Sequence, residues 1–504
     1  MNSHLTDLIA AGKRIATLGS CAAVLGWDQE TYMPTGAIEH RANQIALLST
    51  LAHEQFTGPD YKAKLAACVD LETGTPILAD LSPTETVLLK ELYRDWRLAC
   101  CLPTSFVEAF STLKSQAQHA WQTAKETDDF SHFAPHLTQL IEKVKQKAAF
   151  YGYKDHPYDA LLDEYEPGMT VAVLKPLFAE LKTAIVTLLN SLQAKPHAPF
   201  LDLGQFTFPK DLQWDFGISV LKDMGYDFNR GRQDISSHPF TTEFHPTDVR
   251  ITTRLHPNRF MEAFSSTVHE GGHALYEQGL PLDWYGTPLC QATSLGIHES
   301  QSRLWENLVA KSLPFWEGYY PKLQALMPDP FRSISLRDFY RSINQARPSL
   351  IRVESDELTY NLHILIRFEL ELALISGELA VADLPEAWNT AYEKTLGIRP
   401  TSNATGVLQD VHWSMGAIGY FPTYTLGNLY SAQLFEAAKS AIPTLETSIQ
   451  NGQLAPLTQW LRTHVHAKGR QLGAEALVRG ITGSGLSIQP FMTYLTSKFD
   501  GIYS

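Results

Sequence analysis

Apolar residues spaced three and four positions apart run through most of this 504-residue chain, and they constrain its fold more than any other feature. This spacing is typical of helices that bury one face. The clearest case is the segment 352–379, in which Gly377 stands near the end and the steps join Leu358, Leu362, Leu365, Ile366 and Leu370. Similar patterns recur in the first 150 residues and after Ala432. No internal repeat, low-complexity tract or long linker interrupts them, so we predict a mainly α fold in one domain, residues 1–504.

One segment departs from this periodicity. In DVRITTRL, residues 248–255, Val249, Ile251 and Thr253 alternate with charged or polar residues, a pattern that predicts a half-buried strand. The segment lies shortly before a pair of histidines. A short sheet beside a catalytic helix could bind an extended peptide by adding it as another strand.

Charge and cysteine content exclude several classes of protein. Lys and Arg number 41 against 54 Asp and Glu, a net charge of −13 that disfavours nucleic acid and anionic membranes as partners. Lys13 and Arg14 stand where a signal peptide needs its apolar core, and no uninterrupted apolar run reaches the roughly 20 residues of a membrane span. Five cysteines without a CxxC spacing indicate reduced thiols. We therefore expect a cytoplasmic protein.

The sequence HEGGH at 269–273 carries the strongest chemical signal. Histidines four positions apart on a helix share a face, with β-carbons about 5–6 Å apart, so both rings can bind one cation. Glu270 can then reach a water held on that cation, which is the arrangement of zinc peptidases. Gly271 and Gly272 each cost about 1 kcal/mol in a helix interior. We interpret them as room for another backbone, of protein or substrate, to approach the metal helix.

A catalytic zinc usually takes three protein ligands, so a third is needed outside HEGGH. Glu299 lies 26 positions after His273, enough for a loop and an antiparallel return of the chain. Such a residue alone is more often a solvated helix carboxylate. Glu277 is too near in sequence to complete the site easily, and Glu306, on the face of Glu299, is the alternative ligand.

The motifs together resemble one family. HEGGH followed by HESQSRLWEN (298–307) resembles the M32 metallopeptidases of the thermostable-carboxypeptidase type, as do GWDQETYMP (26–34), DVRITT (248–253), IRVESD (351–356) and GVLQDVHW (406–413). The resemblance implies a neurolysin-like zincin fold, nearly all helical, with a deep central groove and a short sheet beside the metal-binding helix. It also implies a homodimer that removes C-terminal residues from peptides with broad side-chain tolerance, proline being disfavoured. Ser355 stands where the family usually has alanine, a small-for-small change that we expect to preserve activity.

Carried over by position, the resemblance makes His269, His273 and Glu299 the ligands of Zn²⁺ and Glu270 the carboxylate that activates the bound water. Cobalt shares these ligands, so Co²⁺ is a possible substitute. Donors to the tetrahedral oxyanion are also needed. His412, and Tyr420 or Tyr424, are the candidates, mainly because of the resemblance.

An exopeptidase must also bind the free carboxylate of its substrate. A guanidinium suits this task because its planar fork can donate two parallel hydrogen bonds. We select Arg352, with an i,i+4 ion pair to Asp356 as the alternative reading; Asp356 could also orient the arginine. Arg250 is the second choice, since it fits the solvated face of the predicted strand equally well.

Two other functions remain open from sequence. A zinc endopeptidase or oligopeptidase could use the same ligands, and would lack a cationic subsite for the terminal carboxylate. A helical peptide-binding protein without catalysis is a further alternative. Intact HEGGH, Glu299 and the other motifs argue against it.

Overall fold

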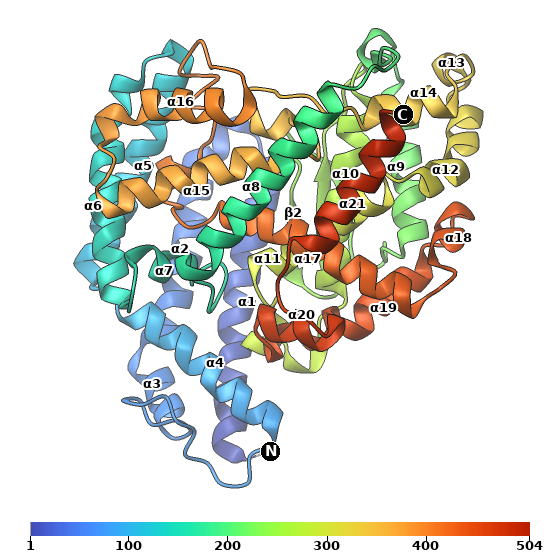
Figure 1. Ribbon diagram of the computed structural model, residues 1–504. Coiled ribbons are helices and arrows are strands. Elements are labelled where there is room, and N and C mark those ends of the chain that lie inside the picture. Colours follow the sequence, from blue (N-terminus) through green and yellow to red (C-terminus); the bar gives the residue numbers. More distant parts are fainter. Residues whose placement is uncertain (1) are drawn as a thin grey trace.

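Helices form most of the computed structural model, which describes residues 2–504. The prediction of a mainly α fold is confirmed, and Figure 1 shows the helices arranged around a small central sheet. The α-helices are α1 (Ser3–Thr31), α2 (Ile38–Thr57), α3 (Pro59–Ala66), α4 (Pro83–Cys100), α5 (Thr104–Thr127), α6 (Ala134–Tyr151), α7 (Pro157–Leu162), α8 (Val171–Gln193), α9 (Lys210–Met224), α10 (Phe260–Gln278), α11 (Leu295–Arg303), α12 (Leu313–Leu326), α13 (Pro328–Phe331), α14 (Leu336–Ile343), α15 (Tyr360–Ser376), α16 (Leu384–Leu396), α17 (Pro422–Ala441), α18 (Leu445–Gln450), α19 (Ala455–His464), α20 (Ala474–Thr482) and α21 (Gln489–Ile502).

The sheet has three strands, β1 (Gln233–Ile235), β2 (Thr241–His245) and β3 (Asp248–Thr253), in the order β1-β3-β2. β3 pairs in parallel with β1 and antiparallel with β2. The predicted strand at 248–255 is therefore present over 248–253, with Val249, Ile251 and Thr253 buried. Thr252 is buried as well, and its hydroxyl is satisfied by a hydrogen bond with that of Ser236 at 2.7 Å. β2 is left at an edge, beside α1 and α10.

Helix α10 carries HEGGH through the middle of the molecule, between β3, α9 and α11 (Figure 1). Its two glycines allow this packing. A Cβ on Gly271 would lie 2.5 Å from Cδ2 of Leu221 in α9. A Cβ on Gly272 would lie 2.7 Å from the carbonyl oxygen of Gln301 and from Cα of Ser302, both in α11. The backbone that approaches the metal helix is therefore the protein's own.

The predicted helix at 352–379 begins later than its apolar steps suggested. α15 runs only from Tyr360 to Ser376, and Gly377 ends it with a φ of 82° as expected. The carboxylate of Asp356 accepts hydrogen bonds from the backbone N–H groups of Leu358 and Thr359, which forms a turn in place of the first helical turns. The expectation that 352–359 is helical was wrong, apart from the short 3₁₀ turn Arg352–Glu354.

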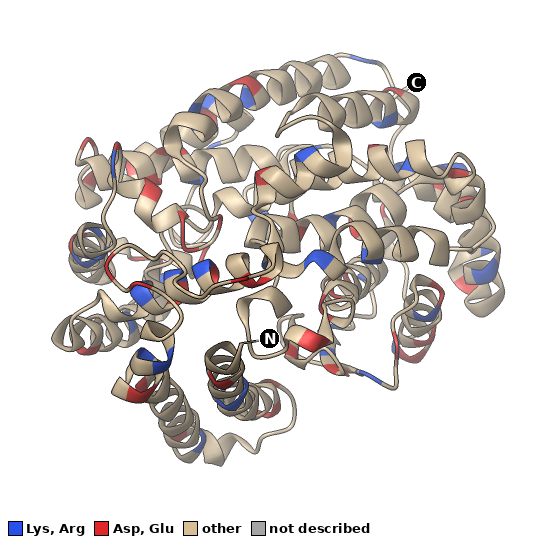
Figure 2. Cartoon of the chain, turned by 90° about the horizontal axis from the view of Figure 1, so that it is seen from below, with Lys and Arg blue, Asp and Glu red and all other residues tan. Residues whose placement is uncertain are grey.

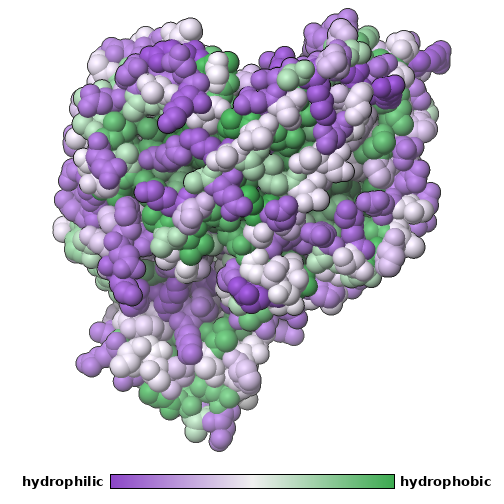
Figure 3. All heavy atoms as spheres, in the orientation of Figure 1, coloured by the Kyte–Doolittle hydropathy of each residue, from purple (hydrophilic) through white to green (hydrophobic). Residues whose placement is uncertain are grey.

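The N-terminal helices form a projection from the main body, at the bottom of Figures 1 and 3. Its small core contains the predicted apolar face of α1, Leu5, Leu8 and Ile9, packed with residues of α3 and α4. By length and mean hydropathy α1 could span a membrane, and only 17% of its most apolar window is buried; Lys13 and Arg14 interrupt its apolar residues, so it contains no uninterrupted apolar run of that length. In the structure α1 lies against α2, α3 and β2.

Charged residues are mixed over the surface. Viewed from below, Figure 2 shows Lys and Arg interspersed with Asp and Glu on most helices. The net charge of −13 is thus distributed, without a large basic face on this side of the molecule.

Candidate metal centre

Three side chains predicted as ligands meet at the middle of α10. Ring nitrogens of His269 and His273 and a carboxylate oxygen of Glu299 all lie within 4.8 Å of one another. Both Nε2 atoms face Oε2 of Glu299, at 3.7 Å for His269 and 3.4 Å for His273. Glu299 stands on α11, which begins at the N-cap Ser294 and packs against α10 through Gly272. On the other side of α11, the absence of a side chain at Gly427 of α17 provides space for Glu299, since a Cβ there would lie 2.5 Å from Cγ of Glu299.

These residues fit a divalent cation. Two imidazoles and one carboxylate are a common donor set for zinc and for other borderline metals. Such ligands must be deprotonated. Burial lowers the pKa of His273 to about 3, and although burial opposes it, Arg303 and His269 hold the pKa of Glu299 well below its usual range. Both side chains are therefore in the form that binds metal.

Glu306, the alternative ligand, has another place in the site. Its Oε2 accepts a hydrogen bond from Nδ1 of His269 at 3.0 Å. Burial works against the charge, but Lys311 and Arg303 hold the pKa of Glu306 well below its usual range. The residue lies in a π-helical turn, Leu304–Val309, that continues α11. The wider turn changes the register after Glu299, so the two carboxylates face different atoms of the cluster.

A second histidine–carboxylate pair lies beside His273. The ring of His298 stacks on that of His273, with centroids 4.3 Å apart. Its Nε2 is 2.9 Å from Oε1 of Glu277, the α10 carboxylate that we considered too close in sequence to be a ligand. Each predicted metal-binding histidine thus has a supporting carboxylate: Glu306 bonds His269 directly, and Glu277 bonds the ring that stacks on His273.

Glu270 reaches from α10 toward β2. Its Oε2 accepts a hydrogen bond from Oγ1 of Thr241 at 2.6 Å, which leaves Oε1 free of a protein partner within residues 2–504. Burial raises the pKa of Glu270 above its usual value. The arrangement holds one carboxylate oxygen and presents the other, as a proton acceptor requires.

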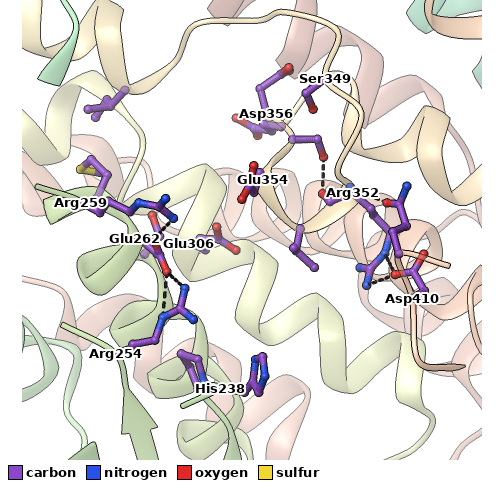
Figure 4. A pocket seen from close by; sticks show the side chains of 18 of the residues that line it. His238, Arg254, Arg259, Glu262, Glu306, Ser349, Arg352, Glu354, Asp356 and Asp410 are labelled. Atoms are coloured by element: carbon purple, nitrogen blue, oxygen red, sulfur yellow. Dashed lines mark hydrogen bonds and ion pairs between the residues drawn. The ribbon is translucent and has the colours of Figure 1, made fainter. Parts of the chain in front are cut away.

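A cleft of about 1350 Å³ opens beside this centre. Figure 4 shows Arg254, just after β3, with Arg259 and Glu262 at the start of α10, across the cleft from Arg352 and Asp410. Glu306 and His412 also line the cleft, which therefore extends from the carboxylate that bonds His269 to the region where we placed substrate binding.

Comparison with known proteins identifies the family. Residues 7–499 match the model of the carboxypeptidase Taq (M32) metallopeptidases. The chain is 41% identical to thermostable carboxypeptidase 1 of Thermus thermophilus, with 99% of this chain and 98% of the relative covered, and 40% identical to carboxypeptidase 1 of Bacillus subtilis, with 97% of each covered. The crystal structure of the M32 carboxypeptidase from Deinococcus radiodurans superposes with a TM-score of 0.96 at 39% identity, covering all of both chains.

The chain belongs to the M32 family. It is a metallocarboxypeptidase, a peptide hydrolase that requires a divalent metal, as its motifs suggested.

Arg352 of this M32 carboxypeptidase is buried and paired with a residue that we did not anticipate. Its Nε and Nη2 lie 2.9 and 2.8 Å from Oδ1 of Asp410, and Nη1 donates to Tyr360 at 3.0 Å. The alternative reading, an ion pair of Arg352 with Asp356, is not found, because Asp356 forms the turn before α15. Ser355, the departure from the family pattern, donates to the carbonyl of Arg352 at 2.6 Å and so supports this segment.

His412, Tyr420 and Tyr424 form an aromatic cluster next to Arg352. Nε2 of His412 is 3.2 Å from the hydroxyl of Tyr424, and the Tyr420 and Tyr424 rings are 5.4 Å apart. The Arg352 guanidinium lies 5.2 Å from the Tyr424 ring centroid. Burial, with the charge of Arg352, lowers the pKa of His412 to about 4. The ring is therefore neutral at ordinary pH.

Arg250, our second choice for carboxylate binding, lies elsewhere in the M32 fold. Its Nε and Nη2 donate to Asp248, each at 2.8 Å. The guanidinium is held between the rings of Trp27 and Phe244, at 4.5 and 4.8 Å from their centroids. It is not among the residues that line the cleft.

Sequence reasoning missed several residues that this carboxypeptidase brings to the site. Asp410 stands inside a quoted motif, GVLQDVHW, so position in the motif was the available signal. Glu306, in HESQSRLWEN, was named only as an alternative ligand and not as the partner of His269. Thr241 had no such signal, because its contact with Glu270 depends on how β2 lies against α10.

Proposed function

We propose that the chain is a zinc carboxypeptidase that removes residues one at a time from the C-terminus of peptides, with broad side-chain tolerance. The observation that carries the proposal is the convergence of His269, His273 and Glu299 beside Glu270, in a chain of the M32 family. The three ligands would hold Zn²⁺, with Co²⁺ as a possible substitute.

A bound divalent cation supplies Lewis-acid chemistry: it polarises the scissile carbonyl and acidifies water. The protein moves the protons. Oε1 of Glu270 takes the proton of the attacking water while Thr241 holds Oε2 at 2.6 Å. The same carboxyl then delivers that proton to the departing amine.

His412 and Tyr420 would stabilise the oxyanion that forms on the substrate carbonyl. A neutral imidazole and a phenol can each donate one hydrogen bond without carrying a full charge into the site. The low pKa of His412, about 4, keeps its ring in the neutral form, and the contact with Tyr424 at 3.2 Å fixes its orientation.

Arg352, with Tyr424, would bind the terminal carboxylate of the substrate. Arg352 and Arg367 share the single carboxylate of Asp410, so this cluster has more positive than negative charge. Of the two arginines, Arg367 is fully buried and Arg352 lines the cleft beside Asp410, so the positive charge of the cluster reaches the cleft at Arg352. A carboxylate there would balance the cluster.

The test is mass spectrometry of a peptide incubated with the enzyme, with and without a chelator. Loss of single residues from the C-terminus alone, abolished by chelator and restored by zinc, is the expected result. A C-terminally amidated copy of the same peptide is the control, and it should be cleaved far more slowly. Equal cleavage of the two would point to an endopeptidase and contradict the proposal.

We further propose that residues 1–504 act as one catalytic domain in a cytoplasmic homodimer whose partners are peptides, not nucleic acid or membrane. Five free thiols and the net charge of −13 support these assignments. For the dimer, α2 has no buried residue although Ile38, Leu47 and Leu51 lie on it. An apolar helix left exposed in one chain suits contact with a second copy.

A further inference from the structure

A second cleft, of about 800 Å³, lies between α1 and the side of the molecule formed by β2 and α10. It is distinct from the cleft that contains Arg352. Much of its wall is apolar, with contributions from Ile15, Ala16, Ala23, Phe56, Phe244 and Tyr285.

The two clefts lie on opposite sides of the metal cluster. Along α10, Ser265 lines the first cleft and Glu277 the second, with the two histidines of the cluster between them. Along β2 the order is the same: Pro239, just before the strand, lines the first cleft and Glu243 lines the second. A peptide whose C-terminus occupies the first cleft would therefore extend its preceding residues into the second.

Three carboxylates line the second cleft: Asp95 is paired with Arg470, Glu277 is paired with His298, and Glu243 has no ion-pair partner among the described residues. The side chain of Glu277 is only 8% exposed; its Oε1 contacts His298, and Oε2 has no partner among the described residues. Glu243 makes no side-chain hydrogen bond or ion pair with any residue in 2–504, and it is open to the cleft. Enclosure by protein, then the charge of Glu277, raise the pKa of Glu243 to about 7. No Lys or Arg of the described chain lines this cleft.

We propose that the second cleft binds a positively charged group of the substrate on the N-terminal side of the cleaved bond, through Glu243 and Glu277. The group is the side chain of Lys or Arg, or the free α-amino group of a short peptide. A cation there would pair with Glu243 and with the free Oε2 of Glu277, and the apolar wall would pack against a Lys or Arg stem. This inference rests on the proposed binding of the substrate C-terminus near Arg352.

The strand geometry sets the position of the charged residue. Thr241, which contacts Glu270, and Glu243 are two residues apart and lie on the same side of β2, about 7 Å from each other. An extended peptide advances by a similar length over two residues. The cationic group therefore belongs one or two residues before the cleaved bond.

The first experiment measures kcat/KM for N-acetylated peptides with a free C-terminus that carry Lys or Gln at successive positions before the cleaved bond. The wild-type enzyme should prefer Lys at one of the two nearest positions by about tenfold, equivalent to about 1.4 kcal/mol. Glu243→Gln should lose this preference while retaining activity on the Gln peptide. Glu243→Lys should reverse it. Glu180→Gln, an exposed carboxylate on α8, is the control and should behave as the wild type.

A second comparison separates the two sources of positive charge. If the α-amino group is bound, short peptides should be cleaved faster with a free N-terminus than when acetylated, and Glu243→Gln should remove the difference. The inference would be overturned if the wild type cleaved Lys and Gln peptides, and free and acetylated peptides, at equal rates. It would also be overturned if Glu243→Gln kept the preference of the wild type for the positively charged peptide. The proposed function would survive both results, since it fails only if free-acid peptides are not shortened from the C-terminus.

Discussion

The hydrogen bond from Nδ1 of His269 to Glu306 fixes which nitrogen of this ring carries the proton. Because a carboxylate can only accept, Nδ1 is protonated, and Nε2 is the ring nitrogen that faces Glu299. Arg303 and Lys311 in turn bind the carboxylate of Glu306, at 3.1 and 2.9 Å. The ligand is therefore oriented by a chain of charged groups before any metal binds.

Replacing Glu306 by Gln should weaken metal binding by about 10–100-fold, because the amide is uncharged and can present its NH₂ group to Nδ1. Titration against a chromophoric chelator would measure the metal Kd. Glu317→Gln removes an exposed carboxylate on α12 and should leave the Kd unchanged. A Kd for Glu306→Gln equal to that of the wild type would mean that this hydrogen bond does not position His269.

At Arg352 we predict a loss of activity that is selective for peptides with a free C-terminal carboxylate. Lys keeps the charge but not the planar fork, so Arg352→Lys should lower kcat/KM for free-acid peptides by about 10–100-fold. Amidated peptides, which have no carboxylate to bind, should be affected much less. Arg250→Lys is the matched variant, an arginine also paired with an aspartate but away from the cleft. If that variant showed the selective loss, our second choice of residue would be the correct one.

The separate residues differ in how far the sequence could locate them. HEGGH sets two histidines on one helical face, so spacing alone predicts that they converge. To predict that Glu299 joins them, it was enough to assume that the next helix returns along α10. The pairing of Arg352 with Asp410 joins positions 58 residues apart, and nothing local indicates it. The local partner Asp356 looked equally suitable until its role in the turn was known.

At the scale of elements, α11 is held between α10 and α17 by a glycine on each side. Gly272 meets the backbone of α11, and Gly427 meets the side chain of Glu299. The helices approach more closely than side chains would allow, which brings Glu299 to the two histidines. The glycines that weaken α10 as an isolated helix are thus part of the metal site.

Gly427→Ala should therefore disturb the ligand itself. Its methyl group would lie 2.5 Å from Cγ of Glu299, so α17 or the carboxylate must move, at about 1–3 kcal/mol of stability. We expect a lower Tm and reduced bound metal after dialysis. The control is Gly480→Ala in α20, where nothing lies within 4 Å of the new Cβ, and where alanine should be neutral or stabilising. Full metal content in Gly427→Ala would show that α11 can shift without loss of metal binding.

Element boundaries were the least predictable part of the fold. The apolar steps of 352–379 identify a buried helix but not its first residue, because the side-chain bonds of Asp356 compete with helical ones. The π-helical turn at Leu304–Val309 left no pattern in the sequence, since a wider turn alters hydrogen bonding rather than composition.

At the scale of the whole molecule, the site is built from segments spread over most of the chain. α1 borders the second cleft, β2 and α10 cross the centre, and the loops at 352–357 and 409–412 close the first cleft. Composition and periodicity predict the helices but not which faces meet around a groove. The groove was expected only from the family resemblance.

Burial also sets how the molecule responds to acid. His466 is fully buried, its Nε2 lies 2.9 Å from Oε1 of Gln301, and burial lowers its pKa to about 3. The unfolded chain binds a proton at this residue below about pH 6.5, whereas the folded chain does so only near pH 3. The stability contributed by neutral His466 is thus present above pH 6.5 and is lost as the pH falls.

We predict that His466→Gln loses less stability than the wild type between pH 7 and pH 5, by about 2 kcal/mol. The substitution removes one proton taken up on unfolding, although it can lower stability at pH 7 by altering the packing against Gly279. Urea unfolding at both pH values, in chelator so that metal release does not contribute, measures the difference. His119→Gln, at an exposed histidine, should keep the wild-type dependence. An equal acid-induced loss in His466→Gln and the wild type would mean that His466 takes up its proton within the folded protein, and that the region around α10 and Gln301 opens in mild acid.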